Sequence, residues 1–465
     1  MFKKIAYNTG INFIAKIIAT ALGLAAVVLM TRYLGTLGFG QYTIIIAYLQ
    51  FFGLVADMGL TLVSAQLLAK YEGEEEKIIA NLFSFRLLTA AILLGLAPIV
   101  VIFMPYAWPV KIGVFIATIS FLFIALNQVL IGFYQKHLLM AKASIAEIGG
   151  RVVLVIFVLA AVLLQWGLQG IVAATTLASI AQFFINYFLS LPYIKIRFAV
   201  DAKIWRDIVR LCWPIAITIT FNIIYLKADT LILSLLQSET VVGLYGAAYR
   251  VIDILVTLPF ILAGLALPQL TGALKSKNDA GFKAIIQHSF DVMAIIALPL
   301  AVGAQFVAAP LMRLVAGKEF FASGAILQML IFAAAAIYLG VIFSHVIIAI
   351  EKQKQTIWAY IFVAVTALTG YLIFIPQYSY FGAAAVTIYS EVAIALLIFG
   401  ITYYYTRFIP NFIVSLKAVL ACAVMGLGLY FFNLAVVPAI IVAGILYSVM
   451  LYLLARNDLR KMIQN

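Results

Sequence analysis

The feature that most limits the possible folds is a series of long apolar stretches. A helix needs roughly 20 consecutive apolar residues to cross a bilayer. Apolar residues make up 66% of the chain and charged residues only 10%, too few to cover a water-soluble surface. The sequence therefore predicts an all-α integral membrane protein with about 14 transmembrane helices. The predicted spans lie near residues 8–30, 40–68, 80–104, 111–134, 146–165, 169–190, 208–236, 242–272, 284–309, 323–350, 355–375, 381–403, 411–431 and 436–454.

The basic residues predict how the chain is oriented. If the N-terminus is cytoplasmic, nearly all lysines and arginines at the span ends fall in inner loops. The exceptions are Arg32, Lys111, Arg313 and Lys318. Cytoplasmic loops of membrane proteins carry such an excess of positive charge, which accounts for the net charge of +13 without a nucleic-acid partner. We expect a multi-pass protein of the plasma membrane with both termini in the cytoplasm.

The order of the spans predicts two helical bundles joined by a linker. The linker's second half is equally well interpreted as an amphipathic helix on the inner leaflet or as a charged loop. Its basic residues are Lys195, Arg197, Lys203 and Arg206. The predicted parts are a six-helix bundle at 1–190, a cytoplasmic linker at 191–207, a second six-helix bundle at 208–403, and an additional helix pair with a cytoplasmic tail at 404–465.

A faint internal repeat relates the two predicted bundles. Gly40-Gln-Tyr42 opens one apolar run and Gly243-Leu-Tyr245 opens another, and the offset is 243 − 40 = 203. The runs close on Gln66-Leu67 and Gln269-Leu270, again 269 − 66 = 203 residues apart. Two similar halves in a membrane chain are typical of transporters whose halves move about a central site.

The motifs around this repeat resemble a known family. They are Thr31-Arg-Tyr-Leu-Gly35, Gly38-Phe-Gly-Gln-Tyr42, Asp57-Met-Gly59, Gly243-Leu-Tyr-Gly-Ala-Ala-Tyr-Arg250, Leu258-Pro259 and Leu267-Pro-Gln-Leu270. Together they resemble the polysaccharide-biosynthesis, Wzx-like branch of the MOP superfamily, which contains flippases of lipid-linked oligosaccharides. The number of predicted spans, where many members have twelve, resembles the peptidoglycan-precursor flippases and some Gram-positive relatives.

The resemblance implies a fold and an activity. The fold would be two six-helix bundles around a cavity lined mainly by the first, second, seventh and eighth spans. The substrate would be an oligosaccharide on an isoprenoid diphosphate, moved from the inner to the outer leaflet by alternating access. A polysaccharide polymerase would be a partner, and the protein would not be an enzyme.

Charged residues inside the spans are the candidate site residues, because a buried charge is costly unless it is paired or faces water. Lys16, Lys227 and Arg250 lie in spans that the resemblance assigns to the cavity, and such cations attract a diphosphate. No acid lies near Lys16 in its own span. We expect these cations to bind substrate together with Asp57 and Asp253.

Four acids are candidates for coupling transport to H⁺ or Na⁺. They are Asp57, Asp229, Asp291 and Glu391. Packing against a polar neighbour explains Asp291 and Glu391 at least as well as ion coupling does, so both interpretations stay open.

Structural pairing is the alternative for several charges. Arg250 and Asp253, three residues apart, share one helix face and could simply neutralise one another. Arg86 lies about four helix positions past the inner loop and could extend to the headgroups. Glu147 and Arg151, four residues apart at the inner start of their span, are expected to pair.

Two other functions are alternatives to a flippase. An ion-coupled multidrug exporter of the same superfamily would prefer an acidic cavity, but the cavity spans carry equal numbers of acids and bases. A membrane glycosyltransferase would need a sizeable outer loop, and the longest here is Ala309–Ala322, with Glu319 its only acid. Phosphate-loop, H-E-x-x-H and G-x-S-x-G patterns are absent, and cysteines and histidines are isolated, so neither a cofactor nor a metal is expected.

Overall fold

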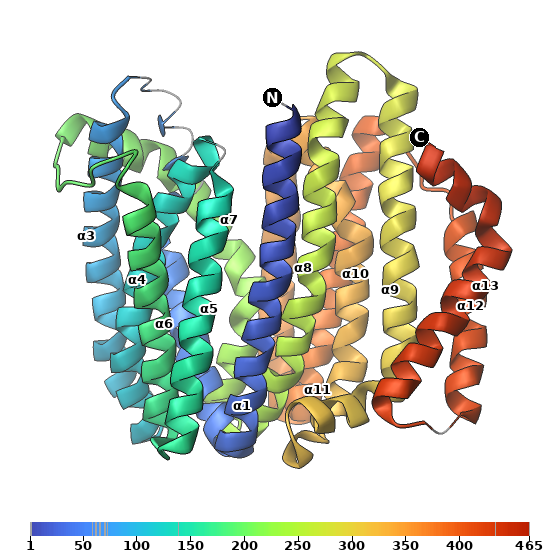
Figure 1. Ribbon diagram of the computed structural model, residues 1–465, viewed down its shortest axis with the longest axis horizontal. Helices are drawn as coiled ribbons and strands as arrows, with labels where there is room; N and C mark the ends of the chain where they lie inside the picture. Colours follow the sequence, from blue (N-terminus) through green and yellow to red (C-terminus); the bar gives the residue numbers. More distant parts are fainter. Residues whose placement is uncertain are drawn as a thin grey trace. The chain divides into compact units, whose positions relative to one another are not determined.

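The computed structural model describes residues 2–464 apart from 58, 61, 62, 65, 66, 69, 70, 72, 138 and 433, and the side chains of 2–13, 214–226 and 459–464 are also outside the description. Met58 and Gln66 of the sequence motifs therefore lie outside the described residues. Within the described residues the chain is helical and contains no strand (Figure 1). Eleven of its described helices are long and apolar enough to cross a membrane, which confirms the predicted all-α membrane fold.

The helices follow the predicted spans closely. Two predicted pairs of spans, 8–30 with 40–68 and 355–375 with 381–403, are joined end to end in α1 and α11. Two short 3₁₀ helices, Lys318–Phe320 and Gln353–Thr356, flank α10. The α-helices are α1 Phe2–Asp57, α3 Glu75–Ile102, α4 Trp108–Lys136, α5 Met140–Leu163, α6 Gly167–Ser190, α7 Ala202–Leu236, α8 Glu239–Lys275, α9 Asp279–Val315, α10 Ser323–Ala349, α11 Ile357–Thr406, α12 Ile413–Phe431 and α13 Val436–Gln464.

The kinks in α1 and α11 have identifiable backbone causes. At Gly35 the φ angle is 64°, a left-handed conformation that glycine adopts without a steric cost. Ser379 interrupts α11 with a φ angle of 53°. Each kink divides one long helix into two halves, so the predicted number of spans exceeds the number of continuous helices.

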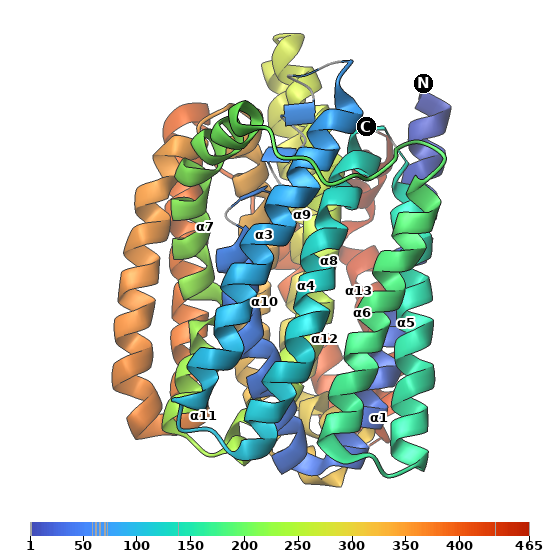
Figure 2. The same ribbon diagram turned by 90° about the vertical axis from the view of Figure 1, so that its left-hand side faces the viewer.

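Contacts divide the chain into two compact units, residues 1–243 and 244–465. The first unit contains α1, α3 to α7 and the start of α8 (Figure 2). A core of aliphatic and aromatic side chains from α3, α4 and α6 continues into the start of α7, where Ile204, Ile208 and Cys212 are buried. The start of α7 is therefore packed as part of the first unit.

The predicted linker is held against α3. The backbone N–H of Ala199 donates to Ser84 Oγ at 2.9 Å, and that of Asp201 donates to Asn81 Oδ1 at 2.7 Å. Lys77 Nζ lies 2.8 Å from an Asp201 carboxylate oxygen. The last residues of the linker form the first turn of α7, which Asp201 caps by accepting from two backbone N–H groups.

The second unit contains most of α8 and the helices α9 to α13 (Figure 1). The pair α12 and α13 packs together and against α9 through Cys422, Met425 and Tyr447. The Tyr447 hydroxyl donates to the backbone carbonyl of Ile295 at 2.7 Å. The pair is thus fastened to α9 by apolar packing and by a polar contact.

The predicted repeat has a physical counterpart within the first unit. A Cβ atom at Gly40 would overlap the backbone carbonyl of Glu239, and a Cβ atom at Gly243 would overlap the carbonyl of Thr36. The offset of 203 that relates Gly40 to Gly243 also relates Thr36 to Glu239, since 36 + 203 = 239. Equivalent positions of the two repeats therefore meet backbone to backbone, which only residues without a side chain permit. Gln41 Nε2 adds a hydrogen bond to Glu239 Oε2 at 2.8 Å.

Candidate functional site

The first charged contact joins α1 to α5. Lys16 Nζ lies 2.8 Å from Glu147 Oε1, and the two side chains are 44% and 26% exposed. Glu147 was predicted to pair with Arg151, and that prediction is wrong. Sequence spacing shows only neighbours on the same helix, whereas packing of α1 against α5 brings a closer cation. Lys16 therefore does have an acidic partner, although none lies in its own helix.

The second charged contact joins α1 to α3 and is far more buried. Arg86 Nη2 lies 2.7 Å from Asp57 Oδ1, and the side chains are 3% and 16% exposed. The same guanidinium donates to the carbonyls of Ala125 at 3.1 Å and Ala56 at 3.3 Å. The prediction that Arg86 extends to the headgroups is therefore wrong, because its partners hold it inside the first unit.

Two further candidate residues lie on α7. The Asp229 side chain is buried and accepts from the backbone N–H of Thr230 at 2.6 Å and from its hydroxyl at 3.2 Å. Lys227, two residues earlier, is half-buried and has polar contacts of its own. Both residues belong to the first unit, as do Lys16 and Asp57.

Arg250 and Asp253 form the intrahelical pair that their spacing indicates. Arg250 Nη1 lies 3.8 Å from Asp253 Oδ2 on α8, and the side chains are 31% and 40% exposed. The contact is longer than a hydrogen bond. It leaves the guanidinium able to bind another oxygen anion without losing a strong partner.

The two remaining acids are buried in separate places of the second unit. Asp291 on α9 accepts from Gln287 Nε2 at 2.9 Å. Gln287 also exchanges two hydrogen bonds with the backbone of Asn411, at 2.9 and 2.7 Å. Glu391 is buried on α11 and has polar contacts. Asp291 thus belongs to a small polar network that ties α9 to the segment before α12.

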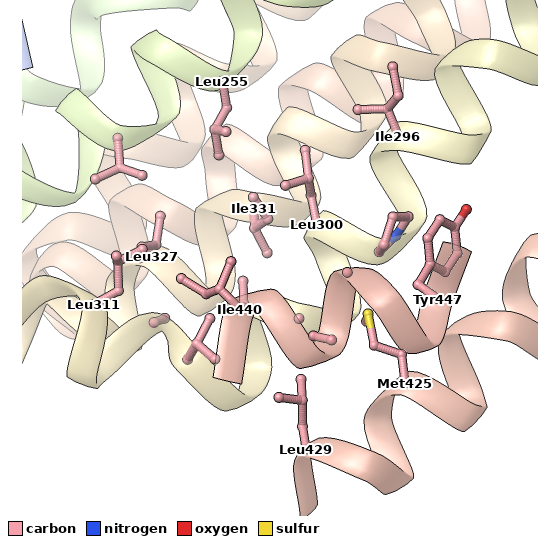
Figure 3. A pocket seen from close by; sticks show the side chains of 18 of the residues that line it. Leu255, Ile296, Leu300, Leu311, Leu327, Ile331, Met425, Leu429, Ile440 and Tyr447 are labelled. Atoms are coloured by element: carbon pink, nitrogen blue, oxygen red, sulfur yellow. The ribbon is translucent and has the colours of Figure 1, made fainter. Parts of the chain in front are cut away.

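An apolar cavity of about 400 Å³ lies in the second unit, and sequence analysis did not predict it. Figure 3 shows its lining, in which aliphatic side chains from several helices surround one space. No charged side chain lines it among the described residues. The sequence carries no signal for it, because the lining positions come from five helices far apart in the chain. They include Leu255 of α8, Leu300 of α9, Ile331 of α10, Met425 of α12 and Ile440 of α13.

These features define a polytopic helical membrane protein: long apolar helices, an internal repeat, charged residues within spans and an apolar cavity. A family model described as polysaccharide biosynthesis protein matches residues 5–271. Because the match covers more than half of the chain, the protein belongs to the polysaccharide biosynthesis protein family. No curated protein matches the sequence significantly.

Solved structures with the same fold are flippases and transporters. "Lipid II flippase MurJ, inward closed conformation" superposes with a TM-score of 0.81 at 16% identity, covering 96% of this chain and 99% of that chain. A multidrug resistance MATE family transporter of the MOP superfamily, in an inward-facing conformation, has a TM-score of 0.70 at 15% identity, covering 84% and 94%. A MOP superfamily transporter from Pyrococcus furiosus has a TM-score of 0.58 at 16% identity, covering 87% and 96%. At these identities the likeness establishes the fold.

Proposed function

We propose that the protein is a flippase that carries an oligosaccharide on an isoprenoid diphosphate from the inner to the outer leaflet by alternating access. Family membership supports a role in polysaccharide biosynthesis. The observation that carries the proposal is the apolar cavity bounded by α8, α9, α10, α12 and α13. A lipid-linked substrate needs an apolar space for its hydrocarbon chain and a charged site for its diphosphate, because these two parts have opposite solvent preferences.

The cavity suits a hydrocarbon chain rather than a polar solute. Its only phenol, Tyr447, directs its hydroxyl to a backbone carbonyl of α9. Lipid tails are as apolar as leucine side chains, so transfer of the chain from bilayer to cavity has little hydrophobic driving force. The cavity instead keeps the chain out of water while the headgroup moves, and its shape selects among chains.

Lys16, Lys227 and Arg250 are the proposed ligands of the diphosphate, and the acids Asp57 and Asp253 are proposed to bind the substrate with them. Lys16 and Arg250 are both partly exposed; Lys16 is paired with one carboxylate at 2.8 Å, and Arg250 has a weaker contact with one at 3.8 Å. A diphosphate offers several oxygen acceptors and more charge than a carboxylate, so it can compete for these partners.

Ion coupling is proposed to use H⁺ or Na⁺ at Asp229, Asp291 or Glu391, with Asp57 as the fourth candidate. Burial of the Asp229, Asp291 and Glu391 carboxylates supports the proposal, since binding a cation removes the cost of a buried negative charge. We further propose that both termini are cytoplasmic, in the plasma membrane, and that a polysaccharide polymerase receives the product. The six-helix bundles 1–190 and 208–403, the cytoplasmic linker 191–207 and the additional helix pair with its tail at 404–465 remain the proposed domains.

The second candidate function is an ion-coupled multidrug exporter. The likeness to multidrug transporters of the same fold favours it. The substrates of the two candidate functions have opposite charge. An exporter of cationic drugs needs an acidic cavity, and a flippase of a lipid diphosphate needs a basic one.

Reconstitution separates the two functions. Proteoliposomes are loaded with a fluorescent disaccharide on farnesyl diphosphate, and dithionite outside the vesicles reports the fraction in the outer leaflet. A flippase raises that fraction with time, and Lys16→Ala or Arg250→Ala abolishes the rise while protein insertion is unchanged. Accumulation of a cationic dye, without movement of the lipid-linked disaccharide, would establish the exporter instead.

A further inference from the structure

Arg151 occupies an unusual position for a charged residue. It is the twelfth residue of the 24-residue helix α5, Met140–Leu163. At a rise of 1.5 Å per residue it lies about 17 Å from the start of the helix, near the middle of a hydrocarbon layer roughly 30 Å thick. The sequence had placed it at the inner start of its span, paired with Glu147. Its Cα atom is about three helical turns from either end of α5.

The surroundings of Arg151 do not neutralise it. Glu147, its expected partner one turn earlier, is taken by Lys16 at 2.8 Å. Among the described residues the structure records neither a salt bridge nor a hydrogen bond for Arg151. Lys16, Glu147 and Arg151 together therefore carry one net positive charge at membrane depth. A charge in that position is found where it faces water or an anionic partner.

Arg151 does not lie on the apolar stripe of α5. The exposed apolar residues Ile145, Val152, Ile156 and Leu159 follow one stripe of α5. Arg151, which is exposed, and Glu147, four residues apart, lie on a different face, beside Gly23 and Lys16 of α1. The guanidinium lies over Gly23 of α1, where a Cβ atom would stand 3.6 Å from Nη1. Gly23 therefore leaves the space on α1 that the guanidinium occupies.

We propose that Arg151 is a further substrate-binding residue, which with Lys16 binds phosphate oxygens of the transported lipid as it passes the middle of the membrane. Phosphates of ordinary lipids stay at the interface, so an anion that reaches this depth must be carried there with the substrate. A guanidinium binds two phosphate oxygens at once in a fixed plane. This inference rests on the proposed function and adds a ligand from α5, a helix that the family resemblance does not place in the cavity.

The test compares farnesyl diphosphate with farnesol, which has the same chain without the charge. Binding to purified full-length protein is measured in detergent by ligand-induced thermal stabilisation. We expect Arg151→Gln to weaken farnesyl diphosphate binding at least tenfold and to leave farnesol binding unchanged, while Arg151→Lys keeps part of the affinity. Arg206→Gln, which removes an exposed arginine from the first turns of α7, is the matched control and should bind as wild type.

A second pair of variants tests the site without removing its charge. Gly23→Ala fits, because its Cβ atom meets the guanidinium at ordinary contact distance. Gly23→Leu fills the space and displaces the guanidinium. We expect Gly23→Ala to bind as wild type and Gly23→Leu to lose affinity for farnesyl diphosphate alone. This pair decides the question if Arg151→Gln does not fold.

The outcomes separate the inference from the proposed function. If Arg151→Gln and Gly23→Leu bind farnesyl diphosphate as wild type while Arg250→Gln does not, Arg151 is no ligand and the proposed function stands. If the wild-type protein itself does not distinguish farnesyl diphosphate from farnesol, both proposals fail.

Discussion

The buried pair Asp57–Arg86 allows a quantitative test of what holds the first unit together. At 2.7 Å and an effective dielectric constant of about 20, the attraction between the two charges is about 6 kcal/mol. Desolvation offsets most of it, so the pair itself contributes little net stability. Removing one partner is different, because the other charge stays buried. We expect Asp57→Leu and Arg86→Met each to lower the free energy of unfolding by about 3–5 kcal/mol.

The double variant Asp57→Leu/Arg86→Met should recover most of that loss. It buries neither charge, so no charge is left in the interior without its partner. The measurement is reversible unfolding of the detergent-solubilised protein with sodium dodecyl sulfate, followed by helical circular dichroism. The reasoning is refuted if the single variants are as stable as wild type, or if the double variant is as unstable as either single one. A folded double variant that no longer transports would show that Asp57 acts beyond this pair.

Three further predictions concern other parts of the chain. Gly40→Ala and Gly243→Ala should each destabilise the first unit, because either Cβ atom meets a carbonyl across the contact; equal thermal melting of both variants and wild type would contradict this. Hydrogen bonds from the Lys77 side chain and from backbone N–H groups lower the pKa of the Asp201 carboxyl below its usual value of 3.8. The stabilisation that the Asp201 carboxylate gives the linker is thus complete above about pH 4 and is lost as pH falls through its lower folded pKa. Hydrogen exchange of the linker should therefore accelerate as pH falls below that pKa, and the Asp201→Asn variant should show no such acceleration. A reporter fused after Lys277 should be cytoplasmic and one after Lys318 external, and the reverse would refute the orientation.

The sequence predicts helices well and contacts between helices poorly, and particular residues show why. Apolar length alone identified the spans, since a bilayer imposes one requirement on every crossing helix. Arg86 was misplaced because its depth was judged from its distance to the loop, while its burial depends on Asp57 and on carbonyls of two other helices. Glu147 was assigned to the wrong cation for the same reason. The apolar cavity was missed because its lining residues come from five helices.

The repeat is the exception, because there a sequence pattern did anticipate a contact between helices. The offset that relates Gly40 to Gly243 also relates the two carbonyls that they approach. Reciprocal contacts of this kind occur where a two-fold axis relates two elements. Two short motifs with few identities are thus supported by a symmetric backbone contact, which random similarity does not produce.

The two ion pairs of α1 differ in exposure, and this difference determines which of them can exchange its carboxylate for a substrate phosphate. Lys16–Glu147 is 44% and 26% exposed, so a substrate phosphate can replace the carboxylate without leaving a buried charge unpaired. Asp57–Arg86 is almost fully buried, and the guanidinium has two further acceptors. Opening that pair would leave an arginine unsolvated inside the unit, at the cost estimated above. Exchange of partners is therefore expected at the first half of α1, and the second half is expected to stay fixed to α3 throughout.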